Sequence, residues 1–157
     1  MSFTERFDAY ACEGDSIRCE VDGFTVTARI VADDCPDAPD QRQDGFWPSL
    51  YKDAPGFIGP GNGFRHRFAE AQARAEAVME AWRKGEWFYC GIVLSVERDG
   101  IELEYHAASL WGVECNYPGT DNSYLATVAN ELLPEALDAS RAAASRLAAT
   151  VTGWAAT

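Results

Sequence analysis

Residues 20–24 read Glu-Val-Asp-Gly-Phe, and residues 97–101 read Glu-Arg-Asp-Gly-Ile. In both stretches an Asp-Gly pair separates two runs in which apolar and polar residues alternate. The two central residues of a type I′ turn need positive φ, which favours Asp-Gly, so each stretch predicts a tight β-hairpin. A helical pattern follows each hairpin, beginning near Phe64 and near Asn122. The elements are therefore predicted to follow the order ββα-ββα.

Alternation along the predicted strands assigns their side chains to two faces. The first hairpin covers residues 17–31, and its apolar face is formed by Ile17, Cys19, Val21, Phe24, Val26, Ala28 and Ile30. One face of the second hairpin is expected to carry Phe88, Cys90, Ile92, Leu94, Val96, Ile101, Leu103 and Tyr105. The opposite face is expected to carry Trp87, Tyr89, Val93, Glu102, Glu104 and His106.

Two helices are predicted to cover the apolar face of the sheet. The first spans about residues 64–84, where apolar side chains recur at intervals of three and four residues. Asn62 is expected to cap its start, and Gly85 is expected to end it. The second opens at residues 121–123, is kinked at Pro134, and continues as an alanine-rich segment.

These elements predict a single α+β domain over residues 1–157. It is expected to be a two-layer sandwich, with a four-stranded antiparallel sheet and both helices on one face. A long acidic loop, rich in proline and glycine, lies at about residues 33–63. Its aromatic residues predict an irregular flap that packs on the body of the domain, with one short helical turn near residues 48–51.

The chain is strongly acidic, with a formal net charge of −12. Residues 1–63 contain twelve acids and five bases, and residues 85–157 contain ten acids and three bases. Only residues 64–84 have more bases than acids, five against three. A negative field repels nucleic-acid phosphates and anionic membranes, so direct binding to either is not expected. It attracts basic surfaces, although net charge also serves solubility alone.

Cysteine usage and hydropathy predict a cytoplasmic protein. The five cysteines form no Cys-x-x-Cys pair, which favours free structural thiols over a disulfide framework or a zinc site. No apolar run reaches the ~18 residues of a membrane span, and the first residues lack the pattern of a signal peptide. No cofactor is expected either, because Gly59-Pro60-Gly61-Asn62-Gly63 lacks the Lys-Ser/Thr of a phosphate-binding loop.

Patterns that would indicate catalysis or metal binding are weak. Cys115 and His106 are the one pair that suggests a nucleophile with its base, but no motif for an oxyanion hole surrounds Cys115. Five residues with oxygen ligands lack the spacing of a calcium loop: Glu102, Glu104, Glu114, Asp121 and Asn122. A solvated acidic face is the simpler interpretation, so no catalytic or metal-ligating residue is predicted.

The polar face of the predicted sheet combines aromatic rings with negative charge. Trp87 and Tyr89 are expected on the polar face of the sheet, beside Glu102 and Glu104. Interfaces are enriched in Trp and Tyr, which favours a binding role for this face. In the alternative interpretation, the long acidic loop folds over the face and buries both rings.

The middle of the chain carries a resemblance to known proteins. It reads Glu-Trp-Phe-Tyr-Cys-Gly-Ile-Val-Leu-Ser at 86–95, Asp-Gly-Ile-Glu-Leu at 99–103, Ala-Ser-Leu-Trp-Gly-Val-Glu at 108–114 and Tyr-Leu at 124–125. This pattern resembles small uncharacterised accessory proteins carried by bacterial phages, plasmids and mobile islands. The resemblance implies the cargo of mobile elements, among which small acidic proteins include anti-restriction and anti-CRISPR inhibitors. It implies no catalytic residues.

Together these features predict a non-enzymatic acidic binding protein that inhibits or modulates a host protein, such as a defence nuclease or surveillance complex, by occupying its basic surface. The residues expected to bind the partner are Asp33, Asp34, Asp37, Trp87, Tyr89, Glu102 and Glu104. Two alternatives stay open. One is a small metal- or thiol-dependent hydrolase built on His106, Glu114, Cys115 and Asp121. The other is a self-associating structural protein in which the alanine-rich helix and Trp154 pair with a second copy, so a dimer is one expected state.

Overall fold

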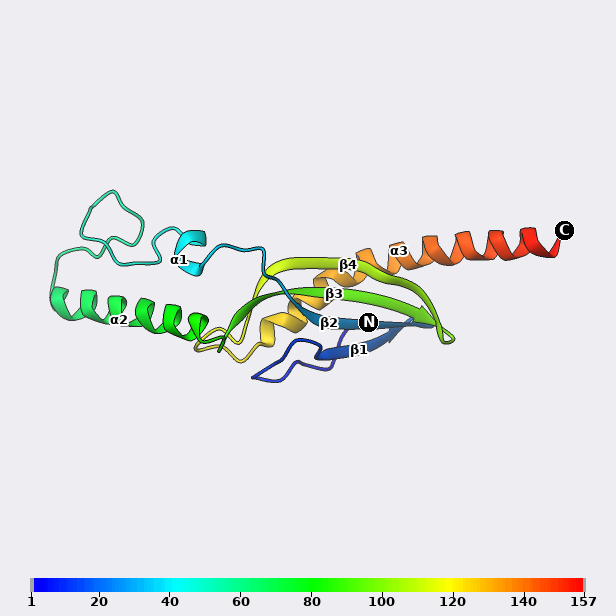
Figure 1. Ribbon diagram of the computed structural model, residues 1–157, viewed down its shortest axis with the longest axis horizontal. Helices are drawn as coiled ribbons and strands as arrows, with labels where there is room; N and C mark the ends of the chain where they lie inside the picture. The colour runs from blue at the N-terminus through cyan, green and yellow to red at the C-terminus, as the bar shows by residue number, and fades with distance from the viewer. Residues whose placement is uncertain (1, 157) are drawn as a thin grey trace.

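An antiparallel β-sheet forms the centre of the molecule (Figure 1). The computed structural model describes residues 2–156. Along the chain its elements are β1 (Ser16–Val21), β2 (Phe24–Ala32), α1 (Pro39–Arg42), α2 (Phe64–Arg83), β3 (Phe88–Arg98), β4 (Ile101–Cys115) and α3 (Ser123–Ala155). The strands lie in the order β1-β2-β3-β4, each antiparallel to the next. The α+β class and the four-stranded antiparallel sheet are confirmed.

Both Asp-Gly pairs form the predicted tight turns. Asp22 and Gly23 have φ values of 52° and 82°, and Asp99 and Gly100 have values of 51° and 78°. Positive φ at both central positions gives a turn the same twist as the strands that it joins. Local sequence therefore sets the register of β1 against β2 and of β3 against the first residues of β4.

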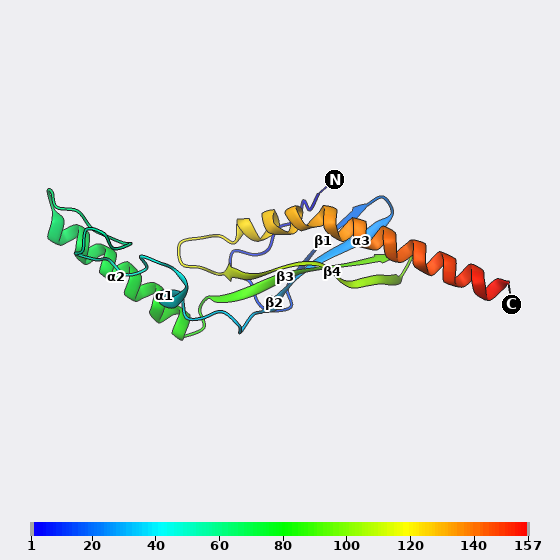
Figure 2. The ribbon, with the colours of Figure 1, turned by 90° about the horizontal axis from the view of Figure 1, so that it is seen from above.

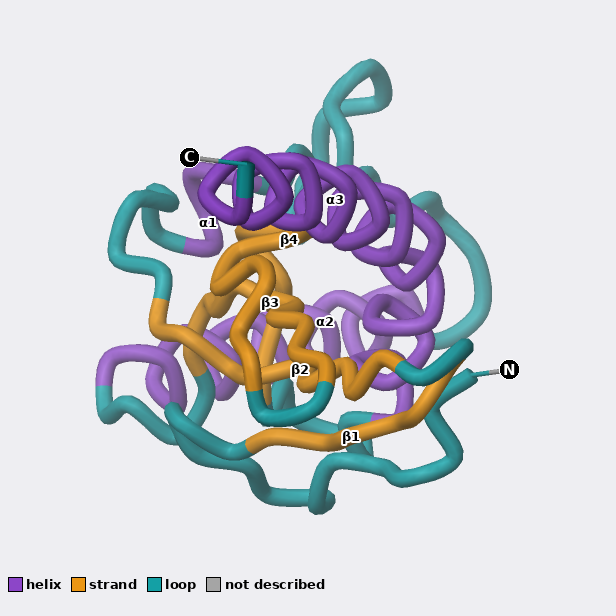
Figure 3. Tube along the Cα trace, turned by 90° about the vertical axis from the view of Figure 1, so that its right-hand side faces the viewer, coloured by secondary structure: helices purple, strands orange, loops and turns teal. Residues whose placement is uncertain are grey.

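The hydrophobic core lies between one face of the sheet and α3, which runs along that face (Figures 2 and 3). The first three strands contribute alternating side chains that are at most 7% exposed: Ile17, Val21, Phe24, Val26, Ala28, Ile30, Cys90, Ile92, Leu94 and Val96. From α3 the core receives Leu125, Ala129, Leu133 and Ala136. Burial of each large aliphatic side chain contributes about 1.5–3 kcal/mol, so this interface supplies most of the stability of the fold.

The N-terminal segment completes the cover of the apolar face. Phe3, Phe7 and Ala11 recur every four residues and are at most 6% exposed within the same core. The backbone N–H of Phe3 donates to Oδ1 of Asn130 on α3, at 2.7 Å. A segment without regular secondary structure is thus fixed by buried rings and by hydrogen bonds to side chains.

α2 does not cover the sheet. It lies beyond one end of the sheet and forms, with α1 and the rest of the long loop, an arm that projects from the body (Figures 1 and 2). The apolar face is already covered by α3 and the N-terminal segment, and few α2 residues are buried: Ala75, Met79 and Ala81. The prediction of both helices on one face is therefore wrong for α2, because α3 and the N-terminal segment cover that face.

Several local details of the helices also differ from the sequence predictions. α2 begins after Gly63, whose φ is 69°, and the side chain of Asn62 makes no cap, whereas Gly85 with φ of 74° follows the helix as predicted. The short helix of the loop is α1 and not residues 48–51, because Pro39 presets the helical φ at its first turn. α3 is continuous through Pro134. No helix of residues 2–156 combines the length and apolar character that a membrane span requires.

β4 is longer than β3 and irregular. It has 15 residues against 11, and register shifts at three places absorb the difference. One shift pairs Glu104 with Val96 but Glu102 with Glu97. Since Val96 and Glu97 point to opposite faces, the two glutamates do so as well, and the prediction that they share a face is wrong. Two residues predicted for the core are exposed: Tyr105 lies on the other face, under Arg29, whereas Ile101 lies at the turn end of the sheet beside α3.

Two asparagines join the loop between β4 and α3 to the N-terminal segment. Asn116 and Asn122 have positive φ values of 62° and 64°, and Asn122 is fully buried. The Asn122 side-chain amide donates to the carbonyl oxygens of Asp8 and Ala9 at 3.0 and 3.2 Å and to Oδ1 of Asn116 at 2.7 Å. Its own Oδ1 accepts the Asn116 backbone N–H at 2.8 Å. Asn116 exchanges two hydrogen bonds of 2.8 Å with the backbone of Ala11.

Replacement of Asn122 by glycine removes these hydrogen bonds but keeps the positive φ of the position. Because three part-buried backbone groups lose their partner, the free energy of unfolding in urea is expected to fall by about 3 kcal/mol. Asn62→Gly is the matched control, since the Asn62 side chain makes no hydrogen bond in the described structure, and it should cost less than about 1 kcal/mol. Equal losses would contradict the role given to Asn122.

Candidate binding site

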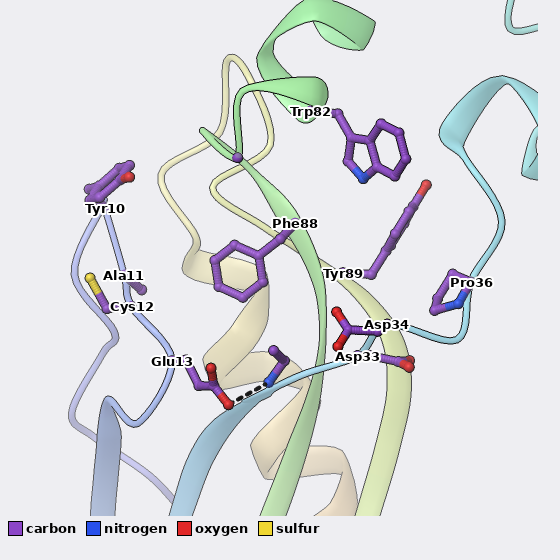
Figure 4. Close-up of a pocket in the computed structure, with 12 residues that line it drawn as sticks. Tyr10, Ala11, Cys12, Glu13, Asp33, Asp34, Pro36, Trp82, Phe88 and Tyr89 are labelled. Atoms are coloured by element: carbon purple, nitrogen blue, oxygen red, sulfur yellow. Dashed lines mark hydrogen bonds between the residues drawn. The ribbon is translucent and has the colours of Figure 1, made fainter.

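An open cavity of about 470 Å³ lies where the sheet meets the arm (Figure 4). Four segments form it: the N-terminal segment, the start of the long loop after β2, the end of α2 and the first residues of β3. Its size falls within the range of about 300–1,000 Å³ that small-ligand pockets occupy. The cavity is therefore the candidate site from which a function can be argued.

Aromatic side chains supply the walls of the cavity. They are Tyr10, Trp82, Phe88 and Tyr89. Phe88 and Tyr89 are neighbours on β3 and point to opposite sides of the strand, with Trp82 on the side of Tyr89 in the view of Figure 4. Trp82 and Phe88 are half-buried, and Tyr10 is 65% exposed. Ring surface is consequently accessible to a ligand that enters from solvent.

Three carboxylates lie beside these rings, those of Glu13, Asp33 and Asp34 (Figure 4). The backbone holds Asp33 in place, because its Oδ2 accepts the Gly112 N–H at 2.9 Å and its Oδ1 accepts the Cys35 N–H at 3.1 Å. Glu13 accepts one long hydrogen bond of 3.4 Å from the last backbone N–H of β2. Asp34 is exposed and forms no hydrogen bond or ion pair with any other described residue.

No lysine, arginine or histidine of residues 2–156 forms an ion pair with these carboxylates, since the six ion pairs found there involve other acids. Asp37 is also exposed and unpaired, in a shallow depression next to the cavity that Arg42 lines as well. Arg42 itself is engaged elsewhere, 4.5 Å above the Tyr89 ring and 3.5 Å from the Gly112 carbonyl oxygen. These carboxylates at the end of the sheet therefore have no ion-pair partner among residues 2–156.

Trp87 and Tyr89 belong to a second, smaller core and are only 1% and 6% exposed. The indole of Trp87 donates to the Val78 carbonyl of α2 at 2.9 Å and packs edge-on against Tyr117 at 5.0 Å. Burial raises the pKa of the Tyr89 hydroxyl. The guanidinium of Arg42, on α1, lies over the Tyr89 ring. The long loop thus helps to cover Tyr89, as the alternative interpretation predicts, whereas α2 covers Trp87.

The predicted partner-binding residues divide into two groups. Asp33, Asp34 and Tyr89 line the cavity, with Asp37 beside it and Trp87 behind it. The two glutamates lie toward the other end of the sheet, near the turn that joins β3 and β4: Glu102 is exposed, and Glu104 pairs with Arg146 of α3 at 3.3 Å. The structure therefore does not bring the glutamates to the cavity.

Of the aromatic and acidic residues that line the cavity, four were not expected there from the sequence: Tyr10, Glu13, Trp82 and Phe88. Trp82 and Phe88 stand in apolar stripes that predict core positions, and both are only half-buried. The recurrence of Phe3, Phe7 and Ala11 indicates that the N-terminal segment packs on something. The surface that it meets is set by Asn116 and Asn122, more than a hundred residues away, and no local pattern reveals this.

Cys115 and His106 do not meet. Cys115 is buried, and the interaction of its thiol with that of Cys90, together with burial, raises the pKa of Cys90. His106 is exposed, and its ring lies 6.2 Å from that of Trp111. Within the described residues, no three His, Cys, Asp or Glu side chains are grouped so as to hold a metal ion.

No protein-family model, curated protein or solved structure matches this chain. What the cavity does is therefore argued from its own geometry and charge.

Neighbouring carboxylates at the cavity have different structural roles, which paired substitutions should separate. Asp33→Ala removes the acceptor for two backbone N–H groups, including that of Gly112 in β4, and is expected to lower the free energy of unfolding by about 2 kcal/mol. Asp34→Ala removes an exposed, unpaired carboxylate and should change it by less than about 0.5 kcal/mol. Urea denaturation of both variants gives the comparison, and equal effects would contradict the tethering role of Asp33.

Proposed function

We propose that this protein is a non-enzymatic acidic binding protein that inhibits or modulates a host nucleic-acid-binding protein by occupying its basic surface. The proposal rests on the carboxylates at the end of the sheet. They form no ion pair with any described residue, and they lie beside accessible aromatic rings. The surface proposed to bind consists of the cavity and the adjoining depression that Asp37 lines, with Glu13, Asp33, Asp34 and Asp37 as its charges.

Electrostatics supports this choice of partner. Like charges gathered on one surface repel one another, and in a chain of net charge −12 the rest of the protein adds to that repulsion. A cationic partner relieves the repulsion, speeds encounter and selects against anionic partners. The same field opposes direct binding of DNA, RNA or an anionic membrane.

A groove that binds nucleic acid is the most suitable basic surface. Such grooves place lysine and arginine side chains at the positions of successive phosphates, and carboxylates on a rigid protein surface can take those positions. The resemblance of residues 86–125 to accessory proteins of mobile elements favours a defence nuclease or a surveillance complex as the partner.

The proposal is tested by retention of proteins from a nuclease-treated host lysate on the immobilised protein. A nucleic-acid-binding protein should be retained in about 0.1 M salt, released in about 1 M salt where charges are screened beyond about 3 Å, and displaced by added duplex DNA or RNA. In the triple variant Glu13→Gln, Asp34→Asn, Asp37→Asn, retention should fall about tenfold or more, since close charge pairs across an interface are each worth over 1 kcal/mol.

A matched variant separates local charge from total charge. Asp44→Asn, Asp53→Asn, Glu131→Gln removes the same number of exposed carboxylates at places away from the cavity, and it should retain the partner as the native protein does. Equal losses in the two triple variants, or retention that is insensitive to salt, would count against a specific acidic site.

Self-association through α3 is a second candidate, supported by a separate observation. The last turns of α3 extend beyond the sheet (Figures 1 and 2). There Leu147 and Val151, 39% and 45% exposed, border a shallow apolar groove together with Ile101 and Leu103. Light scattering at high protein concentration should give a dimer mass that Leu147→Glu reduces to the monomer mass, and a monomer of the native chain would end this candidate.

A further inference from the structure

We infer that the cavity holds the guanidinium group of an arginine side chain that the basic partner supplies, an inference that rests on the proposed function. The ligand chemistry is that of a flat, delocalised cation on an alkyl stem. Aromatic walls would stack on its faces, and carboxylates would accept its N–H donors.

The protein already binds guanidinium groups to aromatic rings within its own structure. Arg42 lies 4.5 Å from the centre of the Tyr89 ring, and Arg29 lies 4.0 Å from the centre of the Tyr105 ring. Both distances are inside the limit of about 6 Å for a cation–π interaction. Trp82, the ring type with the strongest cation–π attraction, is half-buried in the cavity, and no cation of the described residues lies over it.

The carboxylates complete the site for a cation. Asp34 has both oxygens available, because no described residue donates to it. Glu13 accepts only one long hydrogen bond, and two backbone N–H groups fix the position of the Asp33 carboxylate. A guanidinium can form parallel hydrogen bonds to one carboxylate and share the field of the other two.

Other ligand classes fit less well. An anion would meet three carboxylates without a cation, and a neutral apolar ligand would remove water from those charges without replacing its hydrogen bonds. A lysine ammonium is a strongly hydrated point charge, whereas the guanidinium is weakly hydrated and planar, which suits stacking between rings. Tyr10, 65% exposed at the edge of the cavity, leaves room for a side chain that arrives from another protein.

The test uses the ¹⁵N-labelled full chain and two small probes, Nα-acetyl-arginine amide and Nα-acetyl-citrulline amide. Citrulline has nearly the shape of arginine but no charge. The arginine probe should produce saturable NMR shifts of the Trp82 indole N–H and of the Asp34 and Gly85 backbone N–H groups, with a Kd of about 1 mM. The citrulline probe should bind about tenfold more weakly or worse.

Matched variants locate the binding. Asp34→Asn should weaken binding of the arginine probe about fivefold, and Asp53→Asn, the same change at another exposed carboxylate, should leave it unchanged. Equal binding of the two probes, an Asp34→Asn protein that binds like the native one, or shifts confined to residues outside the cavity would overturn the inference. If the small probe fails to bind while the acidic triple variant still loses the partner, the proposed function stands and the arginine pocket does not.

Discussion

The side chains of Asn116 and Asn122 fix the N-terminal segment, and the cavity depends on that. Residues 8–11 belong to no strand or helix, so they have no regular backbone ladder to hold them. The two side-chain amides hydrogen-bond to their backbone instead, from positions where both asparagines have positive φ. The same contacts place Tyr10 and Glu13 opposite the first residues of β3, which makes a wall where the sheet would otherwise end in solvent.

A second constraint is the irregular course of β4 at Gly112. A register shift between Cys90 and Ile92 of β3 leaves the Gly112 backbone out of the regular ladder. Its N–H then donates to Asp33, and its carbonyl accepts from Arg42. The φ of 73° favours glycine, and a Cβ here would lie only 3.0 Å from Nη2 of Arg42. The shift thus ties the start of the long loop and α1 to the sheet, beside the cavity.

Basic and acidic side chains predominate in different parts of the structure. The excess of basic residues belongs to α2, which projects with the arm, whereas unpaired carboxylates gather where the arm meets the sheet. Arg42 is the cation nearest to the cavity in the loop, but Tyr89 and Gly112 engage it. The cavity combines carboxylates with accessible aromatic rings, and this combination favours a binding role.

Features set by residues close together in the chain were predictable from the sequence. The Asp-Gly turns follow from φ preferences, the apolar faces of β1, β2 and β3 follow from alternation, and the extent of α2 follows from helical periodicity. The net charge of −12 is likewise a property of composition. Three of the residues predicted to bind a partner, Asp33, Asp34 and Tyr89, line the cavity, although nothing in the sequence indicated that they lie together.

Which elements cover the apolar face of the sheet could be learned only from the tertiary structure. α2 and α3 both have an apolar stripe, but α3 and the N-terminal segment occupy the single apolar face, so α2 lies outside it. A shift in β4 puts Glu102 and Glu104 on opposite faces, because one inserted residue changes the alternation of the residues that follow it. The cavity walls meet through hydrogen bonds between residues 105 to 114 positions apart, and periodicity, a local signal, contains no information about such contacts.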